Sequence, residues 1–343
     1  MTNRSNSKDV WVFVEQEEGV IADVSLELLA KGQSLAKTLN SQVCALLYGY
    51  QVGELAEKMV HYGADRVLWA DHPELEMYRT LPYARVTTEL VQERQPYICL
   101  FGATAIGRDL APRVASATRA GLTADCTDLQ IGDYTSRKDK RVYNDLLYQI
   151  RPAFGGNLIA TIINPTMHPQ MATVREGVMR RREPDETREG AVEKIEPTFD
   201  ESDLALKILS RETRDSQVNL KDSPIIVSGG GGVGSQDNFE LIRELAHILG
   251  GEVGASRAAV DAGYISREHQ VGQTGTTVRP RLYIAAGISG AVQHRAGMDE
   301  SAKIIAINSD PNAPIFQIAH YKIVGDLTEV IPMMIRALRE KAK

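Results

Sequence analysis

The stretch from residue 256 to 308 constrains the fold most, because apolar runs alternate there with turns rich in glycine and hydroxyl side chains. The turns Gln270–Gly275 and Gly287–Gly290 flank the apolar run Leu282–Ala286, and Ala291–His294 then has the pattern of a first helical turn. A strand that leads through such a turn into a helix N-terminus is a phosphate-binding geometry, since the first N–H groups of a helix have no partner within it. The stretch predicts an α/β fold with a site for a large, multiply hydrogen-bonded ligand. Tight turns that bind nothing are the alternative.

The N-terminal region alternates strand and helix patterns, and Ser25 is placed to cap the first helix. Strands separated by helices indicate parallel pairing in an open, twisted sheet. The predicted strands are Val10–Val14, Val43–Tyr48, Arg66–Ala70 and Tyr97–Gly102, and the predicted helices are Ser25–Leu39, Gly53–Tyr62 and Pro82–Arg94.

Beyond Gly121 the pattern loosens into short β segments, predicted over 125–133, 143–150, 157–163 and 171–174. The charge run Arg137–Arg141 is interpreted as a solvated hairpin tip. The acidic stretch from Glu183 to Glu196, with a proline inside it and another directly after it, is interpreted as a linker zone.

A second α/β unit is expected after Arg214. Pro224–Ser228 reads as a buried strand, Gly229–Gly234 as a glycine-rich loop and 237–249 as a helix. Consecutive glycines between a strand and a helix permit close approach of a pyrophosphate, although a flexible turn would look the same. The predicted organisation is a disordered tip over 1–9, an α/β domain over 10–205, a second domain over 206–329 and a C-terminal helix over 330–343.

Composition excludes several classes of protein. The chain has 343 residues and a net charge of −6, which gives no basic character for nucleic acid. Its three cysteines, Cys44, Cys99 and Cys126, form no CxxC pair, so no zinc or iron–sulfur site is expected and no metal ligand is assigned. No apolar run reaches the length of about 20 residues that spans a bilayer, so no membrane insertion is expected. The polar tip lacks a signal-peptide pattern.

Four motifs carry a resemblance to a known family: Ser256–Gly263, Gln270–Gly275, Leu282–Met298 and Ile304–Phe316. In this order they resemble the FAD-binding domain of the α subunit of electron transfer flavoproteins. Arg151–Asn157 and Pro169–Arg175 resemble motifs of the first domain of the same subunit. The resemblance implies a C-terminal flavodoxin-like, doubly wound FAD-binding domain beside an N-terminal parallel-sheet α/β domain.

The resemblance also implies function. The protein would carry FAD as an electron carrier, together with a separate β subunit, and would exchange electrons with an acyl-CoA or other flavin dehydrogenase. The first domain would pack on the β subunit and hold no cofactor, while the FAD domain would swing between partners. The sequence contains no nucleophile paired with a base, so no substrate chemistry by the chain alone is expected. The resemblance implies an electron carrier instead, and the expected location is the bacterial cytoplasm.

The resemblance assigns roles to individual residues. Arg257 would lie beside the isoalloxazine as a permanent cation that favours anionic reduced forms. His294 would bond the pyrimidine-side carbonyl and, if protonated, stabilise negative charge there. Thr274 and Gln273 would donate near flavin N5. The remaining expected contacts are Ser256, Val271, Gly272 and Gly275 along the flavin, Ser289, Gly290, Ala291, Val292 and Gln293 at the ribityl chain and phosphates, and Asn308, Asp326 and Leu327 at the adenosine end.

One position departs from the family pattern. The family places an arginine third in the glycine-rich loop, where it helps to hold the cofactor, and this chain has Gly231. Backbone N–H groups remain at Gly231, but the point charge is missing, which would weaken FAD affinity or shift its potential.

Two modes of electron transfer stay open. Pro169–Arg175 and Thr277–Pro280 look more like bacterial and anaerobic members, which favours a bifurcating system with NADH and ferredoxin. A conventional shuttle to a quinone reductase is the alternative. A non-redox nucleotide-binding module is the alternative from another class, since fold does not fix function.

Overall fold

The computed structural model describes residues 8–137, 140–153, 158–211, 218–221 and 223–341. The chain divides into two compact units, Met1–Arg211 and Glu212–Lys343. The sequence prediction had placed this boundary at 205/206. Most of the predicted tip, residues 1–7, and the predicted strand start at 157 lie outside the described residues.

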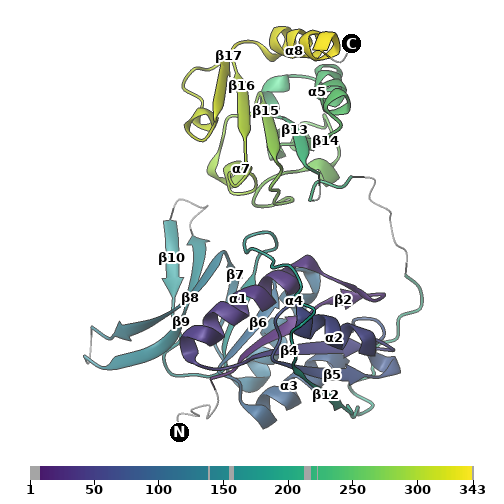
Figure 1. The fold of residues 1–343 in the computed structure, drawn as a ribbon, viewed down its shortest axis with the longest axis vertical. Coiled ribbons are helices and arrows are strands. Elements are labelled where there is room, and N and C mark those ends of the chain that lie inside the picture. Colours follow the sequence, from purple (N-terminus) through teal and green to yellow (C-terminus); the bar gives the residue numbers. More distant parts are fainter. Residues whose placement is uncertain (1–7, 138–139, 154–157, 212–217, 222, 342–343) are drawn as a thin grey trace. The chain divides into compact units, whose positions relative to one another are not determined.

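The N-terminal unit is built on a seven-stranded parallel sheet in the order β12-β5-β4-β1-β6-β11-β7. Helices α1 and α2 pack on one face, and α3 and α4 pack on the other (Figure 1). This doubly wound arrangement is the parallel α/β fold that the sequence predicted. The elements are β1 Val10–Val14, β4 Val43–Gly49, β5 Arg66–Asp71, β6 Ile98–Gly102, β7 Leu122–Cys126, β11 Gln170–Val174, β12 Ala191–Ile195, α1 Asp23–Leu39, α2 Gly53–His61, α3 Thr80–Arg94 and α4 Ala105–Thr118.

The predicted cap of the first helix is wrong. Helix α1 begins at Asp23 after Ala22, and no side chain caps it. Ser25 lies inside the helix, where its buried hydroxyl accepts a hydrogen bond from the backbone N–H of Glu15 at 2.8 Å. This residue therefore ties the helix to the end of β1, a tertiary contact that local sequence does not reveal.

The interpretation of the acidic stretch as a linker zone is wrong as well, because its last part is a strand in the sheet of the first unit. Residues 191–195 form β12, which pairs in parallel with β5 at the edge of the sheet. Arg94 of α3 donates to Glu193 of this strand at 2.7 Å. Edge strands tolerate charged side chains because one side of the strand faces water, so polar composition alone could not separate this strand from a linker.

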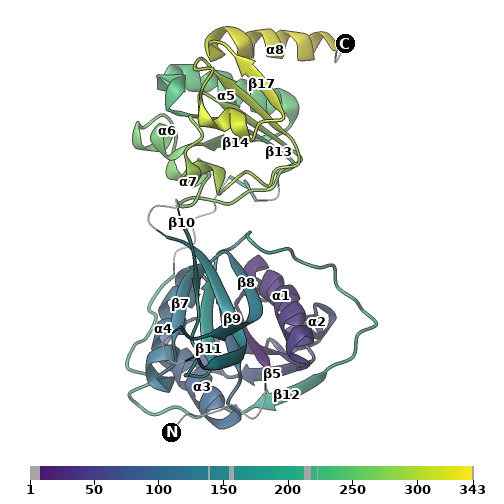
Figure 2. The ribbon, with the colours of Figure 1, turned by 90° about the vertical axis from the view of Figure 1, so that its left-hand side faces the viewer.

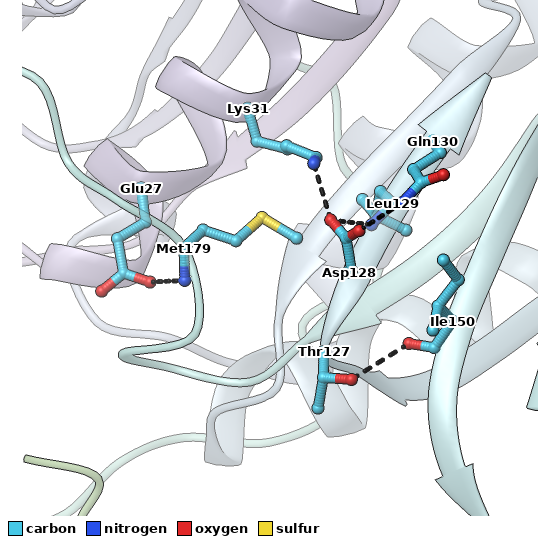
Figure 3. A network of polar contacts seen from close by, with 8 residues as sticks. All are labelled: Glu27, Lys31, Thr127, Asp128, Leu129, Gln130, Ile150 and Met179. Atoms are coloured by element: carbon cyan, nitrogen blue, oxygen red, sulfur yellow. Dashed lines mark hydrogen bonds and ion pairs between the residues drawn. The ribbon is translucent and has the colours of Figure 1, made fainter. Parts of the chain in front are cut away.

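A three-stranded antiparallel sheet of β8 Asp128–Thr135, β9 Val142–Ala153 and β10 Leu158–Ile162 adjoins α1 (Figures 1 and 2). The β8–β9 pair is the predicted hairpin, and positions 138–139 of its turn lie outside the described residues. Figure 3 shows how α1 holds its surroundings: Lys31 bonds Asp128 of β8 at 2.7 Å, and Glu27 accepts from the backbone N–H of Met179 at 3.2 Å.

The C-terminal unit has a five-stranded parallel sheet in the order β14-β13-β15-β16-β17. Numbered along the chain this order is 2-1-3-4-5, which is the flavodoxin-like arrangement and confirms the predicted fold class. The elements are β13 Ile225–Gly229, β14 Glu252–Ala255, β15 Leu282–Ala286, β16 Ile304–Asn308, β17 Tyr321–Val324, α5 Gln236–Leu249, α6 Arg257–Asp261, α7 Val292–Arg295 and α8 Leu327–Lys341.

The C-terminal helix begins at Leu327, three residues before its predicted start at 330. It packs against α5, and its Ile331 and Ile335 are buried in the core of the second unit. The helix is therefore part of this unit rather than an appendage to it. Among the described helices none is long and apolar enough to cross a membrane. The described His, Cys, Asp and Glu side chains form no group of three or more that could hold a metal ion.

Candidate functional site

Parallel strands bring the expected contact residues to one edge of the second sheet. Gly231 follows β13, Ser256 follows β14, Ser289 follows β15, Asn308 ends β16 and Asp326 follows β17. In open α/β sheets ligands bind outside the carboxyl ends of the strands, at the point where the strand order reverses. Here that point lies between β13 and β15, which are the two strands that lead into the glycine-rich loops.

The two glycine loops are packed against each other through their backbones. The N–H of Gly230 donates to the carbonyl of Ala286 at 2.8 Å, and that of Gly232 donates to Gly287 at 2.9 Å. A Cβ on Gly230 would lie only 2.1 Å from the Gly287 oxygen. Gly231 differs, because its nearest obstacle would be the Ala258 Cβ at 3.4 Å. The sheet edge thus presents bare backbone, with room for a side chain at position 231.

Helix α6 places the expected cation next to this loop. Ser256 caps the helix, and its own N–H donates to the Gly229 carbonyl at 2.9 Å, which joins the ends of β13 and β14. Arg257 is the first helical residue, and 69% of its side chain is exposed. Its guanidinium pairs with Asp261 at 3.2 Å, one turn along the helix. An exposed pair of this kind is weak, so the guanidinium can turn to another anion.

The loop 270–275 is held in place at both ends. Val271 donates to Ala255 at the end of β14, and Gln273 donates to the Gln293 carbonyl at 2.7 Å. The Thr274 hydroxyl accepts from the Gln270 side chain at 2.9 Å, so its hydrogen is available to a ligand. Gly275 donates to the carbonyl of Gly272, which closes the turn.

His294, the expected partner of the pyrimidine-side carbonyl, is buried and makes polar contacts through both ring nitrogens. Its Nδ1 is 3.0 Å from the Val271 carbonyl, and its Nε2 is 3.0 Å from the Tyr283 hydroxyl. Burial lowers the pKa of His294 to about 4, although the bond to Val271 opposes the shift. The ring is therefore neutral at pH 7. Because a carbonyl can only accept, Nδ1 carries the proton and Nε2 accepts from Tyr283. The protonation on which the expected stabilisation of negative charge depends is therefore disfavoured by burial.

The segment after β15 offers backbone and small side chains. Gly290 has φ 89°, and a Cβ there would lie 2.2 Å from the nitrogen of Ile315, so only glycine fits. Ala291 precedes α7, and the expected contacts Ala291, Val292 and Gln293 are exposed. This short exposed stretch suits contact with an extended polar chain.

The residues expected at the adenosine end divide into two kinds. The Asn308 side chain donates to the Ile288 carbonyl at 2.9 Å and accepts from the N–H of Asp310. Asp326 accepts from the Thr328 N–H and hydroxyl, which lowers its carboxyl pKa. The Leu327 side chain is buried in the core of the second unit, so a contact with the ligand at this position would come from its backbone.

Sequence reasoning missed two residues that build the site. Tyr283 is fully buried on β15 and holds His294, and Gln270 holds Thr274. Alternation along β15 predicts only that Tyr283 faces one side of the sheet. Its hydroxyl partner comes from α7, and that distance is set by the tertiary fold.

The donor set fits a flavin dinucleotide. Uncharged amides and hydroxyls, one exposed guanidinium and glycine backbone meet at one sheet edge, and the described residues bring no metal-binding cluster there. The glycine loops would receive the pyrophosphate, and Arg257 and the loop 270–275 would receive the ring.

Comparisons with known proteins agree with this geometry. The model of the electron transfer flavoprotein domain matches residues 10–200, and that of the electron transfer flavoprotein FAD-binding domain matches residues 219–299. The electron transfer flavoprotein subunit alpha of Thermoanaerobacterium thermosaccharolyticum is 52% identical, with 97% of this chain and 98% of the relative covered. Protein FixB of Clostridium saccharobutylicum is 49% identical, with 98% of each covered. The acryloyl-CoA reductase electron transfer subunit beta of Anaerotignum propionicum is 43% identical, with 97% and 96% covered.

Proposed function

Since the chain belongs to the electron transfer flavoprotein family, as an alpha subunit with an FAD-binding domain, we propose that it forms a heterodimer with a β subunit and carries electrons to or from a dehydrogenase that acts on a CoA thioester. The similarity to an acryloyl-CoA reductase electron transfer subunit supports this class of partner. The free, buried thiols of Cys44, Cys99 and Cys126 suit a reducing compartment such as the bacterial cytoplasm.

The observation that carries the proposal is the gathering of the expected contacts at the carboxyl edge of one parallel sheet. FAD supplies the redox chemistry when it is bound. The chain's own residues hold it and set its surroundings: glycine backbone faces the phosphates, Thr274 donates a hydrogen bond, and Arg257 supplies positive charge. Neutral His294 fixes the loop 270–275 through Val271.

The first unit has a surface that suits the β subunit. Leu158, Ile159 and Ile162, all on the short strand β10, are 58%, 76% and 38% exposed, so this strand presents several large apolar side chains to solvent. We assign this sheet to the heterodimer contact. The second unit, as a separate compact body, would then move between electron donor and acceptor.

We further propose the bifurcating mode, with NADH as donor and ferredoxin as one acceptor, on the strength of the sequence motifs at 169–175 and 277–280. The test is the flavin content of the complex co-expressed with its β subunit, followed by titration with NADH and ferredoxin. Two FAD per heterodimer and reduction by NADH are expected. One FAD without reaction with NADH would assign the conventional shuttle, and a complex without flavin would refute the proposed carrier.

A further inference from the structure

The N-terminal unit has a crevice of about 600 Å³ at the carboxyl ends of β1 and β4. It is lined by residues that follow β1 and β4, by Ile106 of α4 and by part of the segment 206–211. In the order β12-β5-β4-β1-β6-β11-β7 the strand order reverses between β1 and β6, so the crevice lies beside the position where α/β sheets bind ligands.

The charges in this crevice disfavour a phosphate ligand. Four carboxylates line it, those of Glu17, Glu18, Glu54 and Glu76, with Lys58 and Arg211 as the cations. An acidic crevice attracts a cation and repels a nucleotide. One of the two cations, Arg211, belongs to the segment 206–211, which directly precedes the second unit.

That segment, residues 206–211, is held to the first unit at both of its ends. Arg79 donates from Nη1 to the carbonyl of Leu206 at 2.9 Å. Arg211 forms an ion pair with Glu17, and its Nη1 lies 3.6 Å from Glu18. Between them the Ile208 side chain, 40% exposed, lies among the crevice residues.

We propose that the chain's own segment 206–211, which forms part of the wall of this crevice, acts as a releasable latch on the connection to the second unit. All of the latch contacts lie within the first unit. With the latch closed, the last anchored residue is Arg211. With it open, the last anchored residues are Phe199, which packs on the core, and Asp203, which pairs with Arg85.

The consequence is a change in reach. The first buried residue that the structure describes in the second unit is Leu220. An extended chain spans about 3.3–3.6 Å per residue, so the longest reach to Leu220 is about 30 Å from Arg211 and about 60 Å from Asp203. Opening the latch therefore doubles the distance that the second unit can travel. The effect on electron transfer rests on the proposed function, whereas the latch itself does not.

The contacts are of the strength that a reversible latch requires. The side chains of Arg211, Glu17 and Glu18 are 35%, 65% and 83% exposed. Exposed ion pairs of this kind shift the equilibrium between the closed and the open latch by about five-fold at most. Salt weakens them, because the Debye length is only about 8 Å at physiological ionic strength. The closed fraction should therefore fall as salt rises.

The test is trypsin cleavage after Lys207 in the holo heterodimer, quantified by mass spectrometry. The variant Glu17→Gln/Glu18→Gln leaves Lys207 and Arg211 intact and should be cleaved about two- to five-fold faster, because cleavage follows the population of the open form. The matched control is Glu93→Gln/Glu193→Gln, which removes the two carboxylates that pair with Arg94 elsewhere on this unit and should leave the rate unchanged.

Two further variants make the result decisive. Arg211→Gln should accelerate cleavage as much as Glu17→Gln/Glu18→Gln does. The triple variant should be cleaved little faster than either, because the arginine and the glutamates form one and the same contact. Additive effects, or an unchanged rate in Glu17→Gln/Glu18→Gln, would overturn the proposal. Flavin content is measured in the same samples, so that failure of the latch and failure of the FAD assignment are told apart.

The change in reach is measured by the distance distribution between labels at Ser34→Cys and Gln236→Cys, both exposed positions, one in each unit. The three native cysteines are buried and should not label. Longer separations should appear in Glu17→Gln/Glu18→Gln at low salt and in the wild type at high salt. Identical distributions in all samples would refute the latch.

Discussion

Substitution of Gly230 by alanine tests whether the glycine loops must touch for FAD to bind. Gly230 has φ −101° and ψ −176°, values that alanine adopts readily, so the effect is purely steric. The added Cβ would lie 2.1 Å from the oxygen and 2.5 Å from the carbon of Gly287, and 2.7 Å from the Cα of Ile288. All three are backbone atoms, so no side chain can rotate away to relieve the contact.

The expected loss of FAD affinity follows from the free-energy cost of moving the two glycine loops apart. Overpacking of this kind costs about 1–3 kcal/mol. Separating the loops also breaks a bond such as that from Gly232 to Gly287, 2.9 Å long, which contributes about 0.5–1.5 kcal/mol. The total of about 2–4 kcal/mol corresponds to a loss of FAD affinity by a factor of about 30 to 1,000. Gly231→Ala is the matched control, because its Cβ would make only an ordinary contact with Ala258 at 3.4 Å.

The assay is FAD titration of the deflavinated heterodimer, monitored by flavin fluorescence, with a thermal melt of each variant. Gly230→Ala should bind FAD weakly and melt at lower temperature, while Gly231→Ala should stay within about two-fold of wild type in affinity, as expected for a change without a clash. Wild-type affinity in Gly230→Ala would refute the close contact of the two loops. Equal losses in both variants would show that glycine flexibility, rather than the clash, is what matters.

Three other substitutions probe the same site. Arg257→Ala should lower the flavin reduction potential by roughly 40 mV per electron, or about 1 kcal/mol, measured by dye-linked titration; an unchanged potential would remove Arg257 from the ring environment. Gly231→Arg should tighten FAD binding or raise its potential, because the position is exposed and has room for a side chain; if neither changes, another cation already serves the phosphates. Burial lowers the pKa of His294 from 6.5 to about 4, so the unfolded chain binds its proton first, and stability should fall by up to about 3 kcal/mol as pH drops from about 6.5 towards 4. Urea unfolding at pH 7.5 and 5.0 checks this, and a His294→Gln variant with the same pH slope would contradict it.

Some errors in the sequence prediction share a physical cause. Ser25 has the composition of a helix cap, but its hydroxyl bonds Glu15, ten residues earlier in the chain. The strand Ala191–Ile195 has the composition of a linker, but it pairs with β5, more than a hundred residues away. Local propensity is a weak prior, and a distant partner overrides it in both cases.

The sequence by itself determined the alternation of strand and helix, the two α/β units and the residues that gather at the second sheet's carboxyl edge. It could do so because periodicity and glycine placement are local properties, and parallel strands bring their carboxyl ends to one side. Only the tertiary structure decided that His294 is neutral and held by Tyr283, that Leu327 faces the core, and that Arg211 lies on Glu17. Burial, charge state and ion pairing depend on residues that are distant in sequence, and their separation is set by packing rather than by pattern.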